Sequence, residues 1–229
     1  MFISVIAPAY NEEKLLPIFL KEVVTYLEKM NFNYELIIVE NGSQDKTLEI
    51  ARNFSKKNKR IKVEHLSNPT YGGAMIRGIE KAKGDYIVFF NIDFWDKRFI
   101  DLIKVDLLGY DIVVGSKNLP GSLDRRPFSR RLVTRVFNFF LRIFFGYKGT
   151  DTHGVKVLRR KKLIPIVGKC RTTAGIFDSE MLIRAQRFGM KILELPVEVI
   201  EKRPNRFGFK RILETPKDVF NLFWVLRCK

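Results

Sequence analysis

Cysteine and histidine are scarce in this sequence. Its 229 residues include two cysteines, Cys170 and Cys228, and two histidines, His65 and His153. Their positions do not have the spacing of a zinc site, and two cysteines do not make the disulfide framework of a small secreted domain. The sequence therefore excludes zinc-binding and disulfide-stabilised classes and suits a reducing compartment.

Long apolar runs are also missing. No stretch approaches the ~20 uninterrupted apolar residues of a membrane-spanning helix. Residues 1–7 lack the basic start and small-residue cleavage site of a signal peptide and match a buried first strand better. A composition of 46% hydrophobic and 29% charged residues is typical of a globular protein. We therefore expect a cytoplasmic protein with a single domain over residues 1–229.

Acidic residues are scarce in one half only. Residues 1–116 contain 16 basic and 16 acidic residues and are neutral overall. Residues 117–229 contain 26 basic and 9 acidic residues, which accounts for the whole net charge of +17. This excess favours an anionic partner for the second half: a phosphorylated substrate, a membrane surface or a nucleic acid.

Apolar runs rich in β-branched residues alternate with helical periodicity in the first half. The runs predict strands at 2–7, 34–39, 61–66, 85–90 and 111–115, and the periodicity predicts helices at 12–30, 46–57, 74–83 and 99–107. This alternation predicts an α/β fold with a mainly parallel central sheet and helices on both faces. Ligands of such sheets bind outside the carboxyl ends of the strands. The loops 8–13, 40–46, 68–73 and 91–96 should therefore carry the chemistry.

Two amphipathic segments stand out in the second half. In residues 129–145, the side chains Arg131, Arg135, Asn138 and Arg142 form a narrow polar stripe and the rest of the surface is apolar. Thr215 and the proline after it predict the N-cap and first residue of an aromatic C-terminal helix. Packing on the sheet is one explanation. The wide apolar arc and basic flanks favour contact with a membrane surface.

Polar side chains follow two of the predicted strands. Asp93, after strand 85–90, is suited to hold a divalent cation on a substrate diphosphate, although it could instead cap the next turn. Glu40 and Asn41 follow strand 34–39, and Gly42 allows a sharp turn there. Their side chains are suited to hydrogen-bond a base edge, although each block is an ordinary loop in isolation.

Taken in order, these blocks resemble family-2 inverting glycosyltransferases with the GT-A nucleotide-diphospho-sugar transferase fold. The matching blocks are 7–13, 39–47, 71–74, 84–86, 91–93 and 111–116, followed by 151–156 and 194–197. The last two favour the branch that includes dolichol-phosphate mannose and dolichol-phosphate glucose synthases. The resemblance extends to about residue 206. It implies a metal-dependent hexosyltransferase that uses a GDP- or UDP-linked sugar and a polyprenyl or dolichyl phosphate acceptor.

The resemblance also implies roles for individual residues. It places the donor against Pro8, Ala9, Tyr10 and Glu12, with Glu40 and Asn41 at the base and ribose and with Asn91, Ile92 and Asp93 also in the donor site. It places the metal, Mg²⁺ or Mn²⁺, at Asn91 and Asp93. Asn41 and Asn91 stand where the family has acids, so we expect altered base choice and a metal held by Asp93 and the diphosphate, with Asp96 as a further ligand. Lys117 stands at the position of a frequent arginine.

A polyprenyl phosphate acceptor fits the basic half. Its phosphate is already anionic, so it needs cationic side chains to position it rather than a protein base. The candidates are Lys117, Arg130, Arg131, Arg203 and Arg206. We therefore expect residues 1–116 to bind the donor and residues 117–229 to bind the acceptor, at the cytosolic face of an anionic membrane and without nucleic acid.

Two alternatives remain open. A saccharide hydroxyl as acceptor would need a general base, for which Asp178 is the first candidate and Glu180 the second; Asp178 could instead cap the helix that follows it. A non-catalytic basic protein that binds membranes or RNA is the other alternative. The ordered donor motifs argue against it, because a binding module needs none of them.

Overall fold

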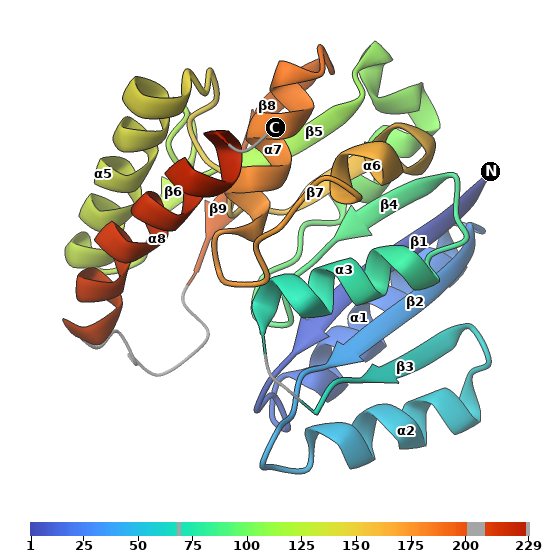
Figure 1. Cartoon of the computed structure of the whole chain (residues 1–229). Coiled ribbons are helices and arrows are strands. Elements are labelled where there is room, and N and C mark those ends of the chain that lie inside the picture. Colours follow the sequence, from blue (N-terminus) through green and yellow to red (C-terminus); the bar gives the residue numbers. More distant parts are fainter. Residues whose placement is uncertain (68–69, 201–208, 228–229) are drawn as a thin grey trace.

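A seven-stranded sheet forms the centre of the molecule in the computed structural model, which describes residues 1–67, 70–200 and 209–227 (Figure 1). The strand order is β3-β2-β1-β4-β7-β5-β8. The strands are β1 (Phe2–Ala9), β2 (Asn33–Glu40), β3 (Ile61–His65), β4 (Tyr86–Phe89), β5 (Ile112–Ser116), β7 (Lys156–Arg159) and β8 (Ile192–Pro196). β7 is antiparallel to both neighbours, and the other pairs are parallel. A two-stranded sheet joins β6 (Leu123–Asp124) to β9 (Glu198–Val199).

Helices cover both faces of the sheet, as predicted. They are α1 (Leu16–Lys29), α2 (Thr47–Lys57), α3 (Tyr71–Lys81), α4 (Arg98–Asp101), the 3₁₀ helix η1 (Leu102–Gly109), α5 (Phe128–Phe145), α6 (Arg160–Val167), α7 (Phe177–Arg187) and α8 (Phe209–Arg227). Successive residues of a strand face opposite sides. Accordingly, Val5 and Ile38 pack with α1 and α2 on one face, whereas Ile6 and Ile37 pack with α3, α6 and α7 on the other.

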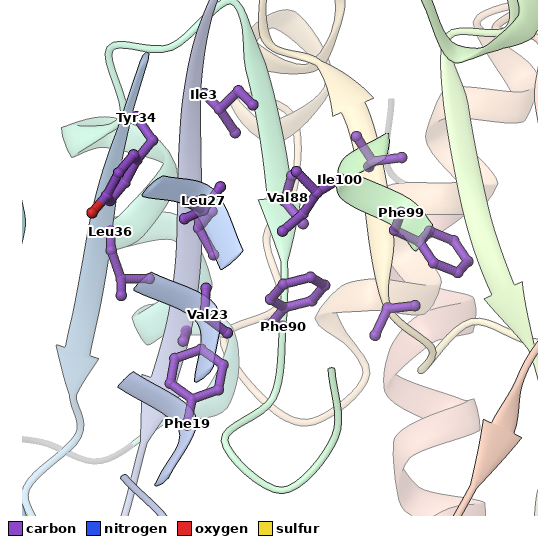
Figure 2. Close-up of a cluster of buried hydrophobic side chains, with 14 of the residues drawn as sticks. Ile3, Phe19, Val23, Leu27, Tyr34, Leu36, Val88, Phe90, Phe99 and Ile100 are labelled. Carbon is purple, nitrogen blue, oxygen red and sulfur yellow. The ribbon is translucent and has the colours of Figure 1, made fainter. Parts of the chain in front are cut away.

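The packing of α1 explains the periodicity of its sequence. Its buried residues recur at spacings of three and four: Leu16, Phe19, Leu20, Val23 and Leu27. Phe19 meets Phe90 edge-on, with ring centroids 6.5 Å apart (Figure 2). The ring of Phe19 also lies edge-on to that of Trp95, with centroids 5.3 Å apart. Each fully buried side chain of this size contributes about 1.5–3 kcal/mol to the stability of the fold. The contact also fixes the chain on the carboxyl side of β4, where candidate metal ligands lie.

Two predicted helices differ from the structure. Residues 99–107 do not form one α-helix: α4 ends at Asp101, and η1 contains left-handed backbone at Asp106, Leu107 and Leu108, with φ of 47°, 52° and 54°. The apolar spacing there reflects a buried turn rather than a helical face. The C-terminal helix begins at Phe209 instead of Thr215. The backbone is already helical before Thr215 and the proline after it, so this pair lies inside the helix and does not cap it.

Helices α5 and α8 lie side by side at one end of the molecule, away from β3 and α2 (Figure 1). The rings of Phe145 and Phe223 meet between them, with centroids 6.4 Å apart. The polar stripe of α5 turns inward at Asn138, which is 4% exposed. In the described part of the chain, no helix combines the length and apolarity needed to cross a bilayer.

Candidate active site

The carboxyl ends of β1, β2 and β4 meet at one edge of the sheet. Ala9 is the register partner of Glu40, and the Asn41 N–H donates to the Ala9 carbonyl at 2.9 Å. Among the predicted donor-binding residues of the first loop, Ala9 and Glu12 are buried, Pro8 is half-buried and Tyr10 is 47% exposed. The parallel strands therefore bring the predicted blocks from both loops together, with Tyr10 as the accessible aromatic side chain.

Hydrogen bonds between the loops after β1 and β2 hold both in place. The Asn11 N–H donates to Ser43 Oγ at 3.0 Å, and the Glu12 N–H donates to Thr47 Oγ1 at 2.7 Å. The Glu13 N–H donates to Asp45 Oδ2 at 3.1 Å. Although burial raises the pKa of Asp45, hydrogen bonds from Thr47 and from the Glu13 N–H lower it overall, so the carboxylate stays ionised. The loops are thus organised before any ligand arrives.

Glu40 and Asn41 are both bound to protein atoms. The Glu40 side chain is fully buried; its Oε1 accepts the Ser43 N–H at 2.5 Å, and its Oε2 lies 2.5 Å from His65 Nδ1. Asn41 is 8% exposed, and its Oδ1 accepts the Thr70 N–H at 3.1 Å. The histidine beside Glu40 was not among the predicted site residues, because a pair between strands that are distant in sequence leaves no local pattern.

The loop after β4 is a tight turn closed by two backbone hydrogen bonds between Asn91 and Phe94, each 3.1 Å long. Ile92 is buried at 1% exposure, whereas Asp93 is half-buried. Asp96 is paired with Arg98, whose Nε lies 3.0 Å from each of the two carboxylate oxygens.

A metal shared with a donor diphosphate fits these residues. In the described part of the chain, no three His, Cys, Asp or Glu side chains gather as a metal cluster. Asp93 and Asn91 nevertheless offer hard oxygen atoms at one turn, and Mg²⁺ commonly takes one or two carboxylates together with phosphate oxygens and water. The donor set is thus sparse, and the ligand must complete it.

Lys117 lies directly after β5 and is paired with Asp151. Its Nζ is 2.6 Å from Asp151 Oδ2, and both side chains are nearly buried, at 6% and 0% exposure. Burial acts to raise the pKa of Asp151, but the charge and hydrogen bond of Lys117 and the His153 N–H lower it to about 2. The charge of Lys117 is therefore largely compensated inside the protein.

A polar cavity of about 130 Å³ opens between the loop after β5 and helix α5. Its lining residues are Lys117, Asn118, Leu119, Ser122, Asp124, Arg131 and Arg135. Asp124 is paired with Arg126 at 2.7 Å, and in the described chain no hydrogen-bond acceptor meets Arg131 Nε. The cavity therefore has cationic groups available for an anion.

The predicted acceptor residues are only partly brought together. The cavity contains Lys117 and Arg131 but not Arg130, while Arg203 and Arg206 lie outside the described residues. Arg135 joins the cavity although it was not among the predicted acceptor residues. Its spacing of four residues from Arg131 places both side chains on one helical face, a signal that the sequence contained.

Asp178 is a fully buried carboxylate, and within the described residues only one of its two oxygens accepts a hydrogen bond. Its Oδ2 accepts the Tyr71 hydroxyl at 2.7 Å, and its Oδ1 lies 3.3 Å from Lys156 Nζ, with both charged side chains 1% exposed. Burial lowers the pKa of Lys156 against the opposing charge of Asp178. The helix-cap interpretation of Asp178 is wrong, because α7 has no side-chain cap bond at its start. Glu180 is also engaged, by the Thr172 N–H at 2.8 Å and Arg184 Nε at 2.7 Å.

The sequence has well-defined relatives. The family model described as Glycosyl transferase family 2 matches residues 4–165. Glycosyltransferase AglD of Haloferax volcanii is 30% identical over 98% of this chain, which spans only 37% of that protein. Dolichyl-phosphate beta-glucosyltransferase of Drosophila melanogaster is 31% identical over 97% of this chain and 74% of its own length.

Solved structures support the same fold. Glucosyl-3-phosphoglycerate synthase of Mycobacterium tuberculosis, in complex with Mn²⁺, UDP-glucose and phosphoglyceric acid, has a TM-score of 0.67 at 20% identity and covers 97% of this chain and 78% of its own. Mannosyl-3-phosphoglycerate synthase of Rubrobacter xylanophilus has a TM-score of 0.70 at 17% identity, with coverages of 99% and 74%. The predicted GT-A fold is confirmed. The family model and the insect relative together show that this chain belongs to glycosyl transferase family 2.

Proposed function

We propose that this protein transfers a hexose from a nucleotide-diphosphate sugar to a polyprenyl phosphate at a membrane surface. The observation that carries the proposal is the cavity beside α5. It is lined by Arg131 and Arg135, and these two cations favour an anionic acceptor. The dolichyl-phosphate glucosyltransferase of Drosophila melanogaster, 31% identical over 97% of this chain, supports it.

The geometry of Asp178 favours a phosphate acceptor over a saccharide hydroxyl. A hydroxyl nucleophile benefits from a base that can take its proton. Asp178 is buried and held by Tyr71 and Lys156, and Glu180 is buried and held by the loop before α7. A phosphate oxygen is already deprotonated and needs orientation instead. In the proposed reaction this oxygen bonds to the anomeric carbon, and the bond from that carbon to the donor diphosphate breaks.

The donor would lie over the carboxyl ends of β1, β2 and β4. Tyr10 offers an exposed ring there. The loops that contain Asn11 and Ser43 are hydrogen-bonded to each other, so they lose little conformational entropy when a ligand binds. Mg²⁺ or Mn²⁺ held by Asp93 and Asn91 would neutralise charge on the leaving diphosphate. Asp93 is half-buried at this turn, directly after Ile92.

The membrane would lie against α5 and α8. Seven apolar side chains of α5 are at least 37% exposed: Phe128, Leu132, Val136, Phe139, Phe140, Ile143 and Phe144. On α8, Phe220 and Trp224 are 61% and 59% exposed. Phe140 and Phe144 stack at 5.8 Å on this surface. An apolar face of this kind beside basic residues is typical of interfacial helices, and it supports a peripheral enzyme on the cytosolic face of an anionic membrane.

The test is transfer of labelled sugar to a short polyprenyl phosphate in detergent. Replacing Arg131 and Arg135 together by Gln should raise the KM for the acceptor by roughly 100-fold or more, because each charged hydrogen bond contributes about 1.5–3 kcal/mol. The KM for the donor should stay unchanged. Arg142→Gln is the matched control, since Arg142 lies on the same helix outside the cavity. Transfer to a saccharide but never to the lipid phosphate would refute the proposal.

A further inference from the structure

Strands β2 and β3 end side by side, and their last residues form an ion pair. Glu40 and His65 are register partners in the parallel ladder. His65 Nδ1 lies 2.5 Å from Glu40 Oε2. The Leu66 N–H donates to the Glu40 carbonyl at 2.9 Å, which fixes the backbone directly after the histidine. The pair is thus built into the carboxyl edge of the sheet.

The two members of this pair differ in their access to solvent. The Glu40 side chain is 0% exposed, and the Ser43 N–H occupies its other oxygen at 2.5 Å. The His65 side chain is 42% exposed. A ligand at this edge can therefore reach the imidazole but not the carboxylate behind it.

The carboxylate determines what the imidazole can offer. Because Glu40 Oε2 is an acceptor, the neutral ring carries its proton on Nδ1, and Nε2 becomes a hydrogen-bond acceptor. Uracil, thymine and guanine carry an imino N–H at the centre of the base-pairing edge. Cytosine and adenine have an unprotonated ring nitrogen there. Nε2 as an acceptor can therefore bond to the imino N–H of uracil, thymine or guanine. It cannot bond to the unprotonated ring nitrogen of cytosine or adenine, because both atoms are acceptors.

We propose that His65 reads the donor nucleobase, with Nε2 accepting the imino N–H of uracil, thymine or guanine, and that Glu40 is the positioning residue that fixes this tautomer. The inference rests on the donor-site part of the proposed function, which places the nucleotide at these strand ends. Base choice then depends on His65, at the end of β3, which lies outside the predicted donor motifs in the loops after β1, β2 and β4. Asn41 is held in place by the hydrogen bond from the Thr70 N–H to its Oδ1.

The decisive variant is Glu40→Gln. The Ser43 N–H needs an acceptor, so it selects the amide oxygen of the new side chain and leaves the N–H₂ group facing His65. That group would donate to Nδ1, which moves the ring proton to Nε2. The exposed nitrogen then donates, and the base preference should shift toward cytosine and adenine. A merely structural role of the pair would not produce such a shift.

The experiment is calorimetric titration of the full chain at pH 8 with Mg²⁺ and UDP, GDP, CDP or ADP. Wild type should bind UDP or GDP at least tenfold more tightly than CDP and ADP. His65→Ala should reduce that ratio by about tenfold, and Glu40→Gln should reduce it further. Lys62→Ala is the matched control, because Lys62 forms the corresponding pair with Glu35 at the opposite end of the same two strands. It should keep the wild-type ratio, and thermal melts should show that each variant is folded.

An unchanged ratio in folded His65→Ala, with lipid transfer intact, would overturn this inference and leave the proposed function standing. A wild-type protein that discriminates among bases through His65 but never glycosylates a polyprenyl phosphate would uphold the inference and defeat the acceptor proposal. If none of the four nucleotides binds to wild type, the donor site and the inference fail together.

Discussion

The polar side chains of the donor loops in residues 1–116 bind one another, whereas helix α5 in the second half has exposed cationic and apolar side chains. The donor loops bind one another through Asn11, Ser43 and Thr47, and Glu40 has no exposed surface. In the second half, Arg135 on α5 faces a cavity, and Phe139 beside it is 58% exposed. This difference would suit the two substrates proposed above, a water-soluble nucleotide-sugar and a lipid phosphate that enters from a membrane.

The buried pair of Lys117 and Asp151 lies where these two regions meet. Lys117 directly follows β5 and lines the cavity. Asp151→Ala should destabilise the fold by about 3–5 kcal/mol, since it leaves a nearly buried ammonium group without its partner. Urea unfolding measures this loss. Asp124→Ala, which breaks the more exposed pair with Arg126, should cost clearly less. Equal losses of unfolding free energy in Asp151→Ala and Asp124→Ala would contradict a special stabilising role for the buried pair.

Removing the single carboxylate at the candidate metal turn should abolish most turnover while the acceptor side remains intact. We expect Asp93→Ala to lower kcat at least 100-fold, about 2.7 kcal/mol, across a Mg²⁺ and Mn²⁺ titration. Liposome binding by α5 and α8 should not change. Asp96→Asn is the control, because Arg98 already occupies Asp96; undiminished turnover in Asp93→Ala would remove that residue from the mechanism.

Acid should weaken the pair of Lys117 and Asp151 within a defined range of pH. The pKa of Asp151 is lowered from 3.8 to about 2, so its contribution is fully present above about pH 4 and is lost as pH falls toward 2. The shift corresponds to about 2 kcal/mol. Unfolding free energies of wild type and Asp151→Asn, measured from pH 5 to pH 2, should converge by about that amount. Parallel curves would show that other carboxylates account for the acid sensitivity.

The smallest expected effect concerns the apolar face of the second half. Replacing Phe140 and Phe144 by Ser should weaken liposome binding by roughly tenfold, because two partly exposed rings no longer enter the lipid. The remaining electrostatic binding should fall as salt rises. Phe188→Ser, at a 61% exposed position on α7's end, should have no effect. Wild-type protein that stays in the supernatant with anionic liposomes at low salt would contradict the membrane assignment.

Most strands and helices of the first half follow from sequence patterns, but few contacts of the second half do. The strands predicted at 2–7 and 34–39 correspond to β1 and β2, because parallel, doubly buried strands are continuous apolar runs. β7 and β8 were not predicted: Lys156–Arg159 is short and charged, and its strand character comes from pairing with β4 and β5. Pairs such as His65–Glu40 depend on register between strands, which local patterns do not specify.

The antiparallel strand β7 has a consequence for biosynthesis. It lies between β4 and β5, so these two strands gain their shared neighbour only when residues Lys156–Arg159 have been made. At a ribosomal rate of about 5–20 residues per second, β4 waits several seconds with an unpaired, apolar edge. Such an edge is a template for pairing with other chains. During synthesis this edge of β4 therefore lacks its native partner until β7 has been made and can pair with it.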